Sequence, residues 1–337
     1  MKIPRHAATS RRSLLAGIGL AAIDLAAGIA PELALAQDGR KPLRIVVPYP
    51  AGGASDTVAR VIGQELQVRL KTTVVVDNRP GASGLIALDM VQKSPPDGTT
   101  LLLVSGAQTL ALAMQADGFD SSRYLTSLGM LYTQKLVLVT SPESRLGGIK
   151  DVAELIAFGK KQVNEPLTFA SSSPGTMGHL VMERFKREAG MPMTHVPYKG
   201  SSAAALDVAG GRVDLFLADQ TSTMPFIRSG KLRAIAVAGS ERVTDLPTVR
   251  TFGEQSFPGL RPSIWAGLAA PPAMPAELTQ RYANEIKAAL ESPAAQEKMR
   301  ATGNDPWYLA PAEMQKYVDG DTLQWSEFIK KNGIAWN

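Results

Sequence analysis

The sequence of 337 residues contains no cysteine and only three histidines, His6, His179 and His195. The absence of cysteine excludes disulfides, thiolate nucleophiles, iron–sulfur clusters and cysteine-ligated zinc. The three histidines are too few and too scattered for a histidine-rich metal site. Residues 37–337 also lack a Gly-x-x-x-x-Gly-Lys-Ser/Thr or Gly-x-Gly-x-x-Gly segment, which would cradle a nucleotide phosphate. We therefore expect no metal and no cofactor.

The first 36 residues have the pattern of a cleavable export signal. A basic start is followed by an apolar stretch over residues 14–30 and then by Ala34-Leu35-Ala36, which predicts cleavage between Ala36 and Gln37. The run Ser10-Arg11-Arg12-Ser13-Leu14-Leu15 fits a twin-arginine signal, and an ordinary Sec signal is the alternative. Asp24 and the short apolar length argue against a membrane anchor. No later stretch reaches 18 apolar residues, so we expect the mature chain to be soluble.

A strong excess of one charge is also missing. The full chain has 36 basic and 31 acidic residues. Cleavage of the signal removes four basic and two acidic residues, which leaves 32 against 29 and a net charge of +3. No cluster of Lys or Arg is longer than two residues. We therefore expect no nucleic-acid partner, since such proteins need a basic patch to neutralise phosphates.

After the signal, short apolar strands alternate with amphipathic helices. This order predicts crossover connections and mainly parallel sheets flanked by helices, an α/β fold. The alternation restarts at residue 136, and a segment with several prolines over residues 258–272 precedes a helical C-terminal part. Strands are expected at residues 43–47, 73–76, 100–104, 136–140, 167–170, 195–198, 213–217 and 234–238. Helices are expected at 57–70, 85–93, 151–160, 179–188, 202–209, 276–291, 294–302 and 311–330.

Because the alternation of strands and helices begins again, the chain divides into two α/β units, and its C-terminal part is expected to return to the first unit. This arrangement is typical of two lobes around a cleft. We expect residues 37–139 and 265–337 to form the first lobe, and residues 140–264 to form the second.

Two loops that join a strand to a helix are the best candidates for a ligand site. Residues 49–56 contain Tyr49, two glycines and Ser55, and residues 171–178 contain three consecutive serines, Gly175 and Thr176. Free N–H groups at a helix start attract an anion, and glycine lets a ligand approach the backbone. The alternative is that Ser55 or Asp56, and Thr176, are only N-caps and the glycines only turn residues. One such loop in each lobe favours a carboxylate clamp across the cleft.

Other polar residues give weaker indications. Gly81-Ala82-Ser83-Gly84 lacks the spacing of a nucleophile elbow. His179 and His195 are expected to cap or pack, because spacing indicates no carboxylate partner for either. Asp219 flanks the carboxyl end of the apolar strand expected at 213–217, where it could bind an ammonium or hydroxyl group or simply lie at the surface. We expect no catalytic residue.

Several motifs, in order, resemble one family. They are Val47-Pro48-Tyr49-Pro50-Ala51-Gly52-Gly53-Ala54-Ser55-Asp56, Asp77-Asn78-Arg79-Pro80-Gly81-Ala82-Ser83-Gly84, Pro95-Pro96-Asp97-Gly98, Gly175-Thr176-x-x-His179-Leu180, His195-Val196-Pro197-Tyr198-Lys199-Gly200 and Gly230-Lys231-Leu232-Arg233-Ala234. Together they resemble the Bug (TctC-type) periplasmic substrate-binding proteins of tripartite tricarboxylate transporters. The match covers nearly all of the mature chain.

The resemblance implies a type II-like periplasmic binding protein that closes as a hinge around a small carboxylate. It implies that loops 49–56 and 171–176 hold the carboxylate through main-chain N–H groups, hydroxyls and waters. Many relatives have an Asp-Asn pair where this chain has Ala218-Asp219, which leaves open whether the ligand is a dicarboxylate, tricarboxylate, amino acid or aromatic acid. The expected binding residues are Tyr49, Ala51, Gly52, Gly53, Ser55, Asp56, Ser105, Ser172, Ser173, Thr176 and Asp219.

The expected function is that of a monomeric receptor that delivers its ligand to a membrane permease and breaks no bond. One alternative is a sensor that presents the ligand to a membrane histidine kinase. Another is an exported hydrolase that uses Ser83 or one of Ser171–Ser173, which would need a Ser–His–Asp arrangement that the sequence does not indicate.

Overall fold

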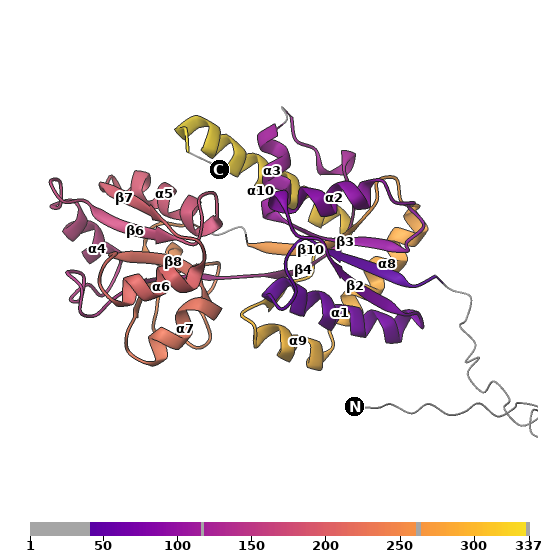
Figure 1. Ribbon diagram of the computed structural model, residues 1–337, viewed down its shortest axis with the longest axis horizontal. Helices are drawn as coiled ribbons and strands as arrows, with labels where there is room; N and C mark the ends of the chain where they lie inside the picture. Colours follow the sequence, from indigo (N-terminus) through magenta and orange to yellow (C-terminus); the bar gives the residue numbers. More distant parts are fainter. Residues whose placement is uncertain (1–40, 116–117, 261–263, 335–337) are drawn as a thin grey trace, which may run out of the picture. The chain divides into compact units, whose positions relative to one another are not determined.

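The computed structural model describes residues 41–115, 118–260 and 264–334. The expected export signal and its cleavage site at Ala36 lie outside the described residues. A compact unit begins at Lys41 and is built on one six-stranded and one five-stranded sheet (Figure 1). Among the described helices, none is both long and apolar enough to span a membrane.

The sheet of the first lobe has the strand order β11-β4-β10-β3-β1-β2. Strand β1 pairs in parallel with β2 and β3, whereas β10 lies antiparallel between β3 and β4. Strand β3 is apolar and buried along most of its length because helices cover both faces of the sheet. The strands are β1 Leu43–Val47, β2 Val74–Asn78, β3 Thr100–Ser105, β4 Thr126–Thr133, β10 Trp265–Ala270 and β11 Asp305–Pro306.

Helices pack on both faces of this first sheet (Figure 1). Apolar residues of α1, α8 and α9 form one buried cluster with it, and residues of α2, α3 and the first half of α10 form another. In α1, Val58, Ile62 and Leu66 recur at helical spacing and are fully buried. The helices are α1 Ala54–Leu70, α2 Leu85–Gln92, α3 Gly106–Gln115, α8 Ala276–Leu290, α9 Pro293–Arg300 and α10 Pro311–Asn332, with short 3₁₀ turns at Ala82–Gly84 and Ser121–Arg123.

The sheet of the second lobe has the order β7-β6-β8-β5-β9. Strand β6 pairs in parallel with β7 and β8, and β5 lies antiparallel between β8 and β9. The two sheets therefore share one plan. In each, the strand that directly follows a crossing from the other lobe (β10 in the first sheet, β5 in the second) lies antiparallel between two neighbouring strands. The strands are β5 Leu136–Thr140, β6 Leu167–Ser171, β7 Met193–Pro197, β8 Leu215–Asp219 and β9 Arg233–Ala238.

Helices also cover both faces of the second sheet. Residues of α4 and α5 pack on one face together with Trp325 and Ile329 from the end of α10, and α6 and α7 pack on the other. The guanidinium of Arg184 on α5 lies 6.0 Å from the ring centre of Trp325. The C-terminal helix thus contributes to the cores of both lobes. The helices are α4 Val152–Gly159, α5 Met177–Ala189, α6 Ser201–Ala209 and α7 Gln220–Arg228, with a 3₁₀ turn at Gly253–Gln255.

The predicted two-lobed α/β architecture is confirmed, with one inserted antiparallel strand in each otherwise parallel core. Residues 136–139, which we expected in the first lobe, belong to β5 and pair with β8 and β9 of the second sheet. We therefore propose that the first crossing between the lobes lies at Gln134–Lys135. Helices α3 and α7 and strands β4, β10 and β11 were not predicted.

Candidate functional site

A cavity of about 290 Å³ is lined by residues from both lobes. It lies where β1, β3 and β4 end in the first lobe and where the loop after β6 enters α5 in the second. We call it the cleft cavity. Its lining consists of Tyr49, Ser55, Ser105, Gly106, Ala107, Leu110, Tyr132, Gln134, Gly175, Thr176, Met177, Ile264 and Trp265.

Four of the predicted binding residues, Tyr49, Ser55, Ser105 and Thr176, line this cavity. The hydroxyls of Tyr49 and Ser105 are hydrogen-bonded at 2.7 Å, and those of Ser55 and Tyr132 at 2.8 Å. Burial raises the pKa of both tyrosines, so each phenol keeps its proton at neutral pH. The cavity therefore offers neutral hydroxyl donors that can turn towards a ligand oxygen.

Three helices begin at the cleft cavity. Ser55 is the second residue of α1, Gly106 and Ala107 are the first two of α3, and Met177 is the first of α5. The first N–H groups of a helix have no partner within the helix, and the aligned peptide dipoles place partial positive charge there. The N-termini of three helices, each with partial positive charge, therefore lie at the cleft cavity.

Two of these helix ends lack a side-chain cap. Gly53 and Thr176 occupy the N-cap positions of α1 and α5, and neither makes a side-chain cap hydrogen bond. By contrast, α4, α7 and α9 are capped by Asp151, Asp219 and Ser292. Ser55 and Asp56 are therefore not N-caps, and Thr176 occupies the N-cap position of α5 without capping it through its side chain. The Thr176 hydroxyl instead donates to the Ser173 carbonyl oxygen at 2.8 Å.

No side chain that lines the cavity in the described part of the chain is charged. An anion would be held by backbone dipoles and hydroxyls alone, as in other helix N-terminal anion sites. Leu110, Met177, Ile264 and Trp265 form an apolar wall, which suits the hydrocarbon part of an organic acid.

Asp56 holds the first loop in shape and does not line the cavity. It is only 2% exposed, and its oxygens accept hydrogen bonds from Gly52 N–H at 2.9 Å, Arg60 Nε at 3.0 Å and Asn78 Nδ2 at 2.9 Å. Burial alone would raise its pKa, but the hydrogen bonds from Arg60, Gly52 and Asn78 lower the pKa below its ordinary value. The loop also requires a positive φ of 86° at Gly52, which glycine adopts without strain.

The remaining predicted contacts lie outside the cavity lining. Ser172 and Ser173 accept hydrogen bonds through their carbonyl oxygens: that of Ser172 from the N–H of Gly200, after β7, at 2.8 Å, and that of Ser173 from the Ser171 hydroxyl at 3.0 Å. Asp219 caps α7 by accepting from Ser222 N–H at 2.9 Å. Ala51, Gly52 and Gly53 form the turn before α1, and none is among the lining residues.

Residues on the two connecting segments complete the cavity and were not predicted. Tyr132 and Gln134 lie where the chain leaves the first lobe, and Ile264 and Trp265 lie where it returns. A chain that crosses twice between two lobes must pass the floor of the cleft between them. The expected crossing points in the sequence could therefore have indicated these residues. Gly106 and Ala107 could have been found because they follow a strand and start a helix, as the two predicted loops do.

Ser171 and His195 form a close polar contact that is not a catalytic pair. The Ser171 hydroxyl lies 2.6 Å from His195 Nε2, but Ser171 is fully buried and is not part of the cavity lining. Its hydroxyl donates to the Ser173 carbonyl oxygen, so this proton serves the loop. The contact therefore gives no support to the hydrolase alternative.

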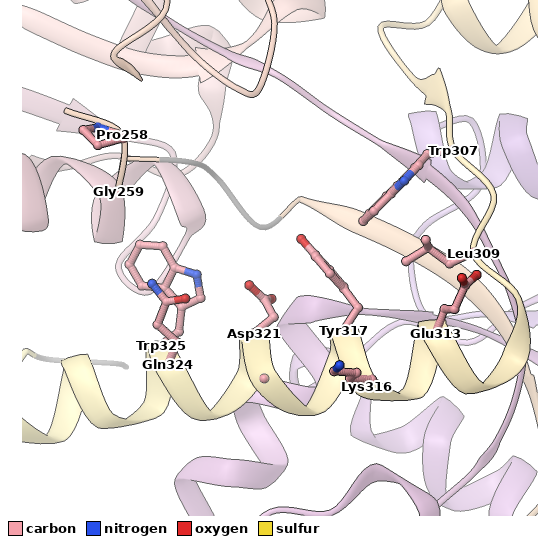
Figure 2. Close-up of a pocket in the computed structure, with 11 residues that line it drawn as sticks. Pro258, Gly259, Trp307, Leu309, Glu313, Lys316, Tyr317, Asp321, Gln324 and Trp325 are labelled. Carbon is pink, nitrogen blue, oxygen red and sulfur yellow. The ribbon is translucent and has the colours of Figure 1, made fainter. Parts of the chain in front are cut away.

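A second, larger groove of about 660 Å³ runs along α10 (Figure 2). Aromatic residues Trp307, Tyr317 and Trp325 line it together with charged side chains. Trp265 separates this groove from the cleft cavity: its indole N–H donates to Asp321 at 2.9 Å, and its ring meets Tyr317 edge-on at 6.3 Å. Because the groove lacks the converging helix starts, the cleft cavity is the better candidate for a ligand site. No group of ligating side chains among the described residues could hold a metal ion.

Sequence comparison identifies similar proteins along most of the chain. A family profile described as "Tripartite tricarboxylate transporter family receptor" matches residues 58–334. Protein BugT of Bordetella pertussis is 33% identical over 323 residues, which cover 95% of this chain and 97% of that protein.

Two similar solved structures contain a carboxylate. The R. palustris protein Rpa4515 with adipate has a TM-score of 0.70 and 29% identity, covering 88% of this chain and 99% of its own. MatC (Rpa3494) from Rhodopseudomonas palustris with bound malate has a TM-score of 0.66 and 25% identity, covering 86% of this chain and 98% of its own.

Proposed function

The chain belongs to the receptor family of tripartite tricarboxylate transporters, whose members bind substrates and are not enzymes, and on that premise we propose that it binds a small carboxylate in the cleft cavity. The arrangement of the helix ends carries this proposal. The N-termini of three helices lie at the cleft cavity, which is lined by neutral hydrogen-bond donors. Helices α1 and α3 belong to the first lobe and α5 to the second. Such a site stabilises negative charge without a basic side chain.

The shape of the lining supports an acid with an apolar body. A carboxylate at α1 and α3 would meet the hydroxyls of Ser55 and Ser105, and a second one at α5 would meet that of Thr176. The apolar wall between these ends would pack against the carbon chain. Adipate and malate, which the two solved relatives bind, both have a carboxylate at each end.

We further propose that the mature protein is a periplasmic receptor that closes on its ligand and delivers it to a membrane permease. Ligand contacts on both lobes would shift the population towards a closed form, because a ligand favours the state in which it makes more contacts. Family membership and the export-signal pattern of residues 1–36 support this role.

A thermal-shift screen of the purified protein tests the binding proposal. The panel contains adipate, malate, citrate, glutamate and benzoate, each paired with its amide as an uncharged control. A carboxylate at 100 times its Kd should stabilise the fold by about 2.7 kcal/mol. We expect at least one acid to raise the melting temperature while its amide does not. Equal shifts with acids and amides, or no shift from any acid, would contradict carboxylate binding.

A further inference from the structure

Two histidines from different elements stack directly beneath the second ligand loop. His179 lies in the first turn of α5 and His195 on the edge strand β7, and their ring centres are 3.9 Å apart with an interplanar angle of 20°. Phe169 of β6 stacks on His195 at 5.0 Å. His179 is only 4% exposed. His179 is thus enclosed between the sheet and α5, whose N-terminus faces the cavity, and His195 is partly buried beside it.

Each ring holds a different part of the loop over residues 171–176. Gly175 N–H donates to His179 Nδ1 at 3.1 Å, and His195 Nε2 lies 2.6 Å from the Ser171 hydroxyl. The Ser171 hydroxyl donates to the Ser173 carbonyl oxygen, which also accepts from the Thr176 hydroxyl. Gly175 and Thr176 line the cleft cavity. The two rings therefore connect to both cavity-lining residues of this loop.

The hydrogen bond from Gly175 fixes the position of the proton on the neutral His179 ring. A backbone N–H can only donate, so His179 Nδ1 accepts and carries no proton, which leaves the proton of the neutral ring on Nε2. The Ser171 hydroxyl lies within hydrogen-bond distance of both the Ser173 carbonyl oxygen and His195 Nε2, and the direction of its bond to the ring follows the tautomer of His195. The loop as observed thus requires a neutral His179.

We propose that the stacked pair of His179 and His195 positions the second ligand loop for anion binding, and that it does so only while His179 Nδ1 is unprotonated. This inference rests on the proposed function, since it concerns the same site. His179 and His195 are positioning residues, because they act on the ligand through Gly175 and Thr176.

Protonation of His179 would oppose this geometry in two ways. A proton on Nδ1 would face the Gly175 N–H, so two donors would meet, and an imidazolium would be buried against the second ring. Facing charges are Glu183, Lys186 and Arg187 on α5 and the titratable His195 on β7; Glu183 is itself paired with Arg187 and Lys186. Burial, His195 and the two cations lower the pKa of His179 to about 4 and outweigh Glu183. The ring is therefore neutral at pH 7.

Two variants of similar size separate positioning from packing. His179→Asn places a carbonyl oxygen near the position of Nδ1 and can still accept from Gly175, whereas His179→Leu cannot. The probe is the carboxylate of the panel that binds the wild-type protein most tightly, measured by calorimetry. We expect His179→Leu to weaken binding by about tenfold or more and His179→Asn to stay within about threefold of wild type. Equal losses in both variants would show a packing role only and overturn the proposal, as would unchanged binding by His179→Leu.

Nitrogen NMR of the ligand-free wild-type protein tests the same inference without any variant. At pH 7 we expect His179 Nδ1 to be unprotonated, and we expect the Gly175 amide signal to shift as His179 titrates towards pH 4. A proton on Nδ1 at pH 7, or a Gly175 signal that ignores the titration, would overturn the proposal. If no carboxylate binds the wild type, the proposed function fails, whereas this NMR result still decides the loop geometry separately.

Discussion

The backbone N–H of Gln134 donates to the carbonyl oxygen of Ile264 at 2.9 Å. This bond joins the segment that leaves the first lobe to the segment that returns to it, and the Thr133 hydroxyl donates to the same oxygen at 3.1 Å. Gln134 and Ile264 both line the cleft cavity. The connection between the lobes is therefore also part of the proposed binding site, which would couple ligand contact to hinge movement.

Removal of the Tyr132 phenol hydroxyl should weaken ligand binding. Tyr132→Phe deletes a buried donor of the cavity while keeping the ring, so we expect about a fivefold to tenfold loss of affinity. The matched control is Tyr308→Phe, because the Tyr308 hydroxyl donates to the Ala283 carbonyl oxygen and lies outside the cavity lining. Calorimetric titration measures both. Similar losses in the two variants would argue against a direct role for Tyr132.

Asp56 should stabilise the first loop in a pH-dependent manner. Asp56→Asn keeps the size but loses the carboxylate that pairs with Arg60, so we expect unfolding at pH 7 to become easier by about 1–3 kcal/mol. The pKa of Asp56 is lowered from 3.8, so its contribution is complete above pH 3.8 and is lost as the pH falls through the lowered value. Urea unfolding at pH 7 and at pH 3 measures this difference. A variant as stable as wild type at pH 7 would contradict the assignment.

Ligand binding should change the fluorescence of Trp265. Its indole is the only tryptophan side chain in the described lining of the cleft cavity, whereas Trp307 and Trp325 line the groove along α10. We expect the ligand-induced signal to disappear in Trp265→Phe and to persist in Trp307→Phe. A signal that survives in Trp265→Phe would place the ligand elsewhere.

The stability of the wild-type fold should fall between pH 6.5 and about 4 because of His179. The pKa of His179 is lowered from 6.5 to about 4, so its contribution is complete above pH 6.5. Below that value the unfolded chain takes up a proton that the folded chain does not, at a cost of up to about 3 kcal/mol. His179→Asn should lose less stability than wild type over this range in urea unfolding. Parallel curves for both proteins would assign the loss to other groups.

The sequence predicted the repeated strand–helix plan because each buried strand is a short apolar run. It did not predict β10, because the short run Trp265–Ala270 contains a glycine and three alanines and lies between Pro262 and Pro271. Likewise, α3 was missed because Gly106–Gln115 follows Ser105 without an intervening loop. Strand β10 is defined by its pairing with β3 and β4, which local patterns do not reveal.

For the site, the sequence indicated two loops that contribute residues to the cleft cavity, but not the direction of each side chain. Ser55 and Thr176 line the cavity, whereas Asp56, one residue further along α1, turns back to Gly52. The orientation of Asp56 depends on its hydrogen bonds with Arg60, on the same helix, and with Asn78, at the end of β2. Contributions from Tyr132 and Trp265 could not be derived from loop composition, because they arise where the chain crosses between lobes.

The central claim is that helix starts at the cleft cavity hold a carboxylate, and a carboxylate built into the chain tests it most directly. Ala107 is an exposed residue at the start of α3, and Ala276 is an exposed residue at the start of α8, outside the cavity lining. Asp at either position suits a helix N-terminus, so Ala107→Asp and Ala276→Asp should both fold with nearly wild-type stability.

The measurement is a calorimetric titration of both variants with the carboxylate that binds the wild type most tightly. We predict that Ala107→Asp loses at least about tenfold in affinity, because its side chain competes for the α3 N–H groups and repels the ligand, and that Ala276→Asp binds like wild type. Wild-type affinity in Ala107→Asp would contradict the account.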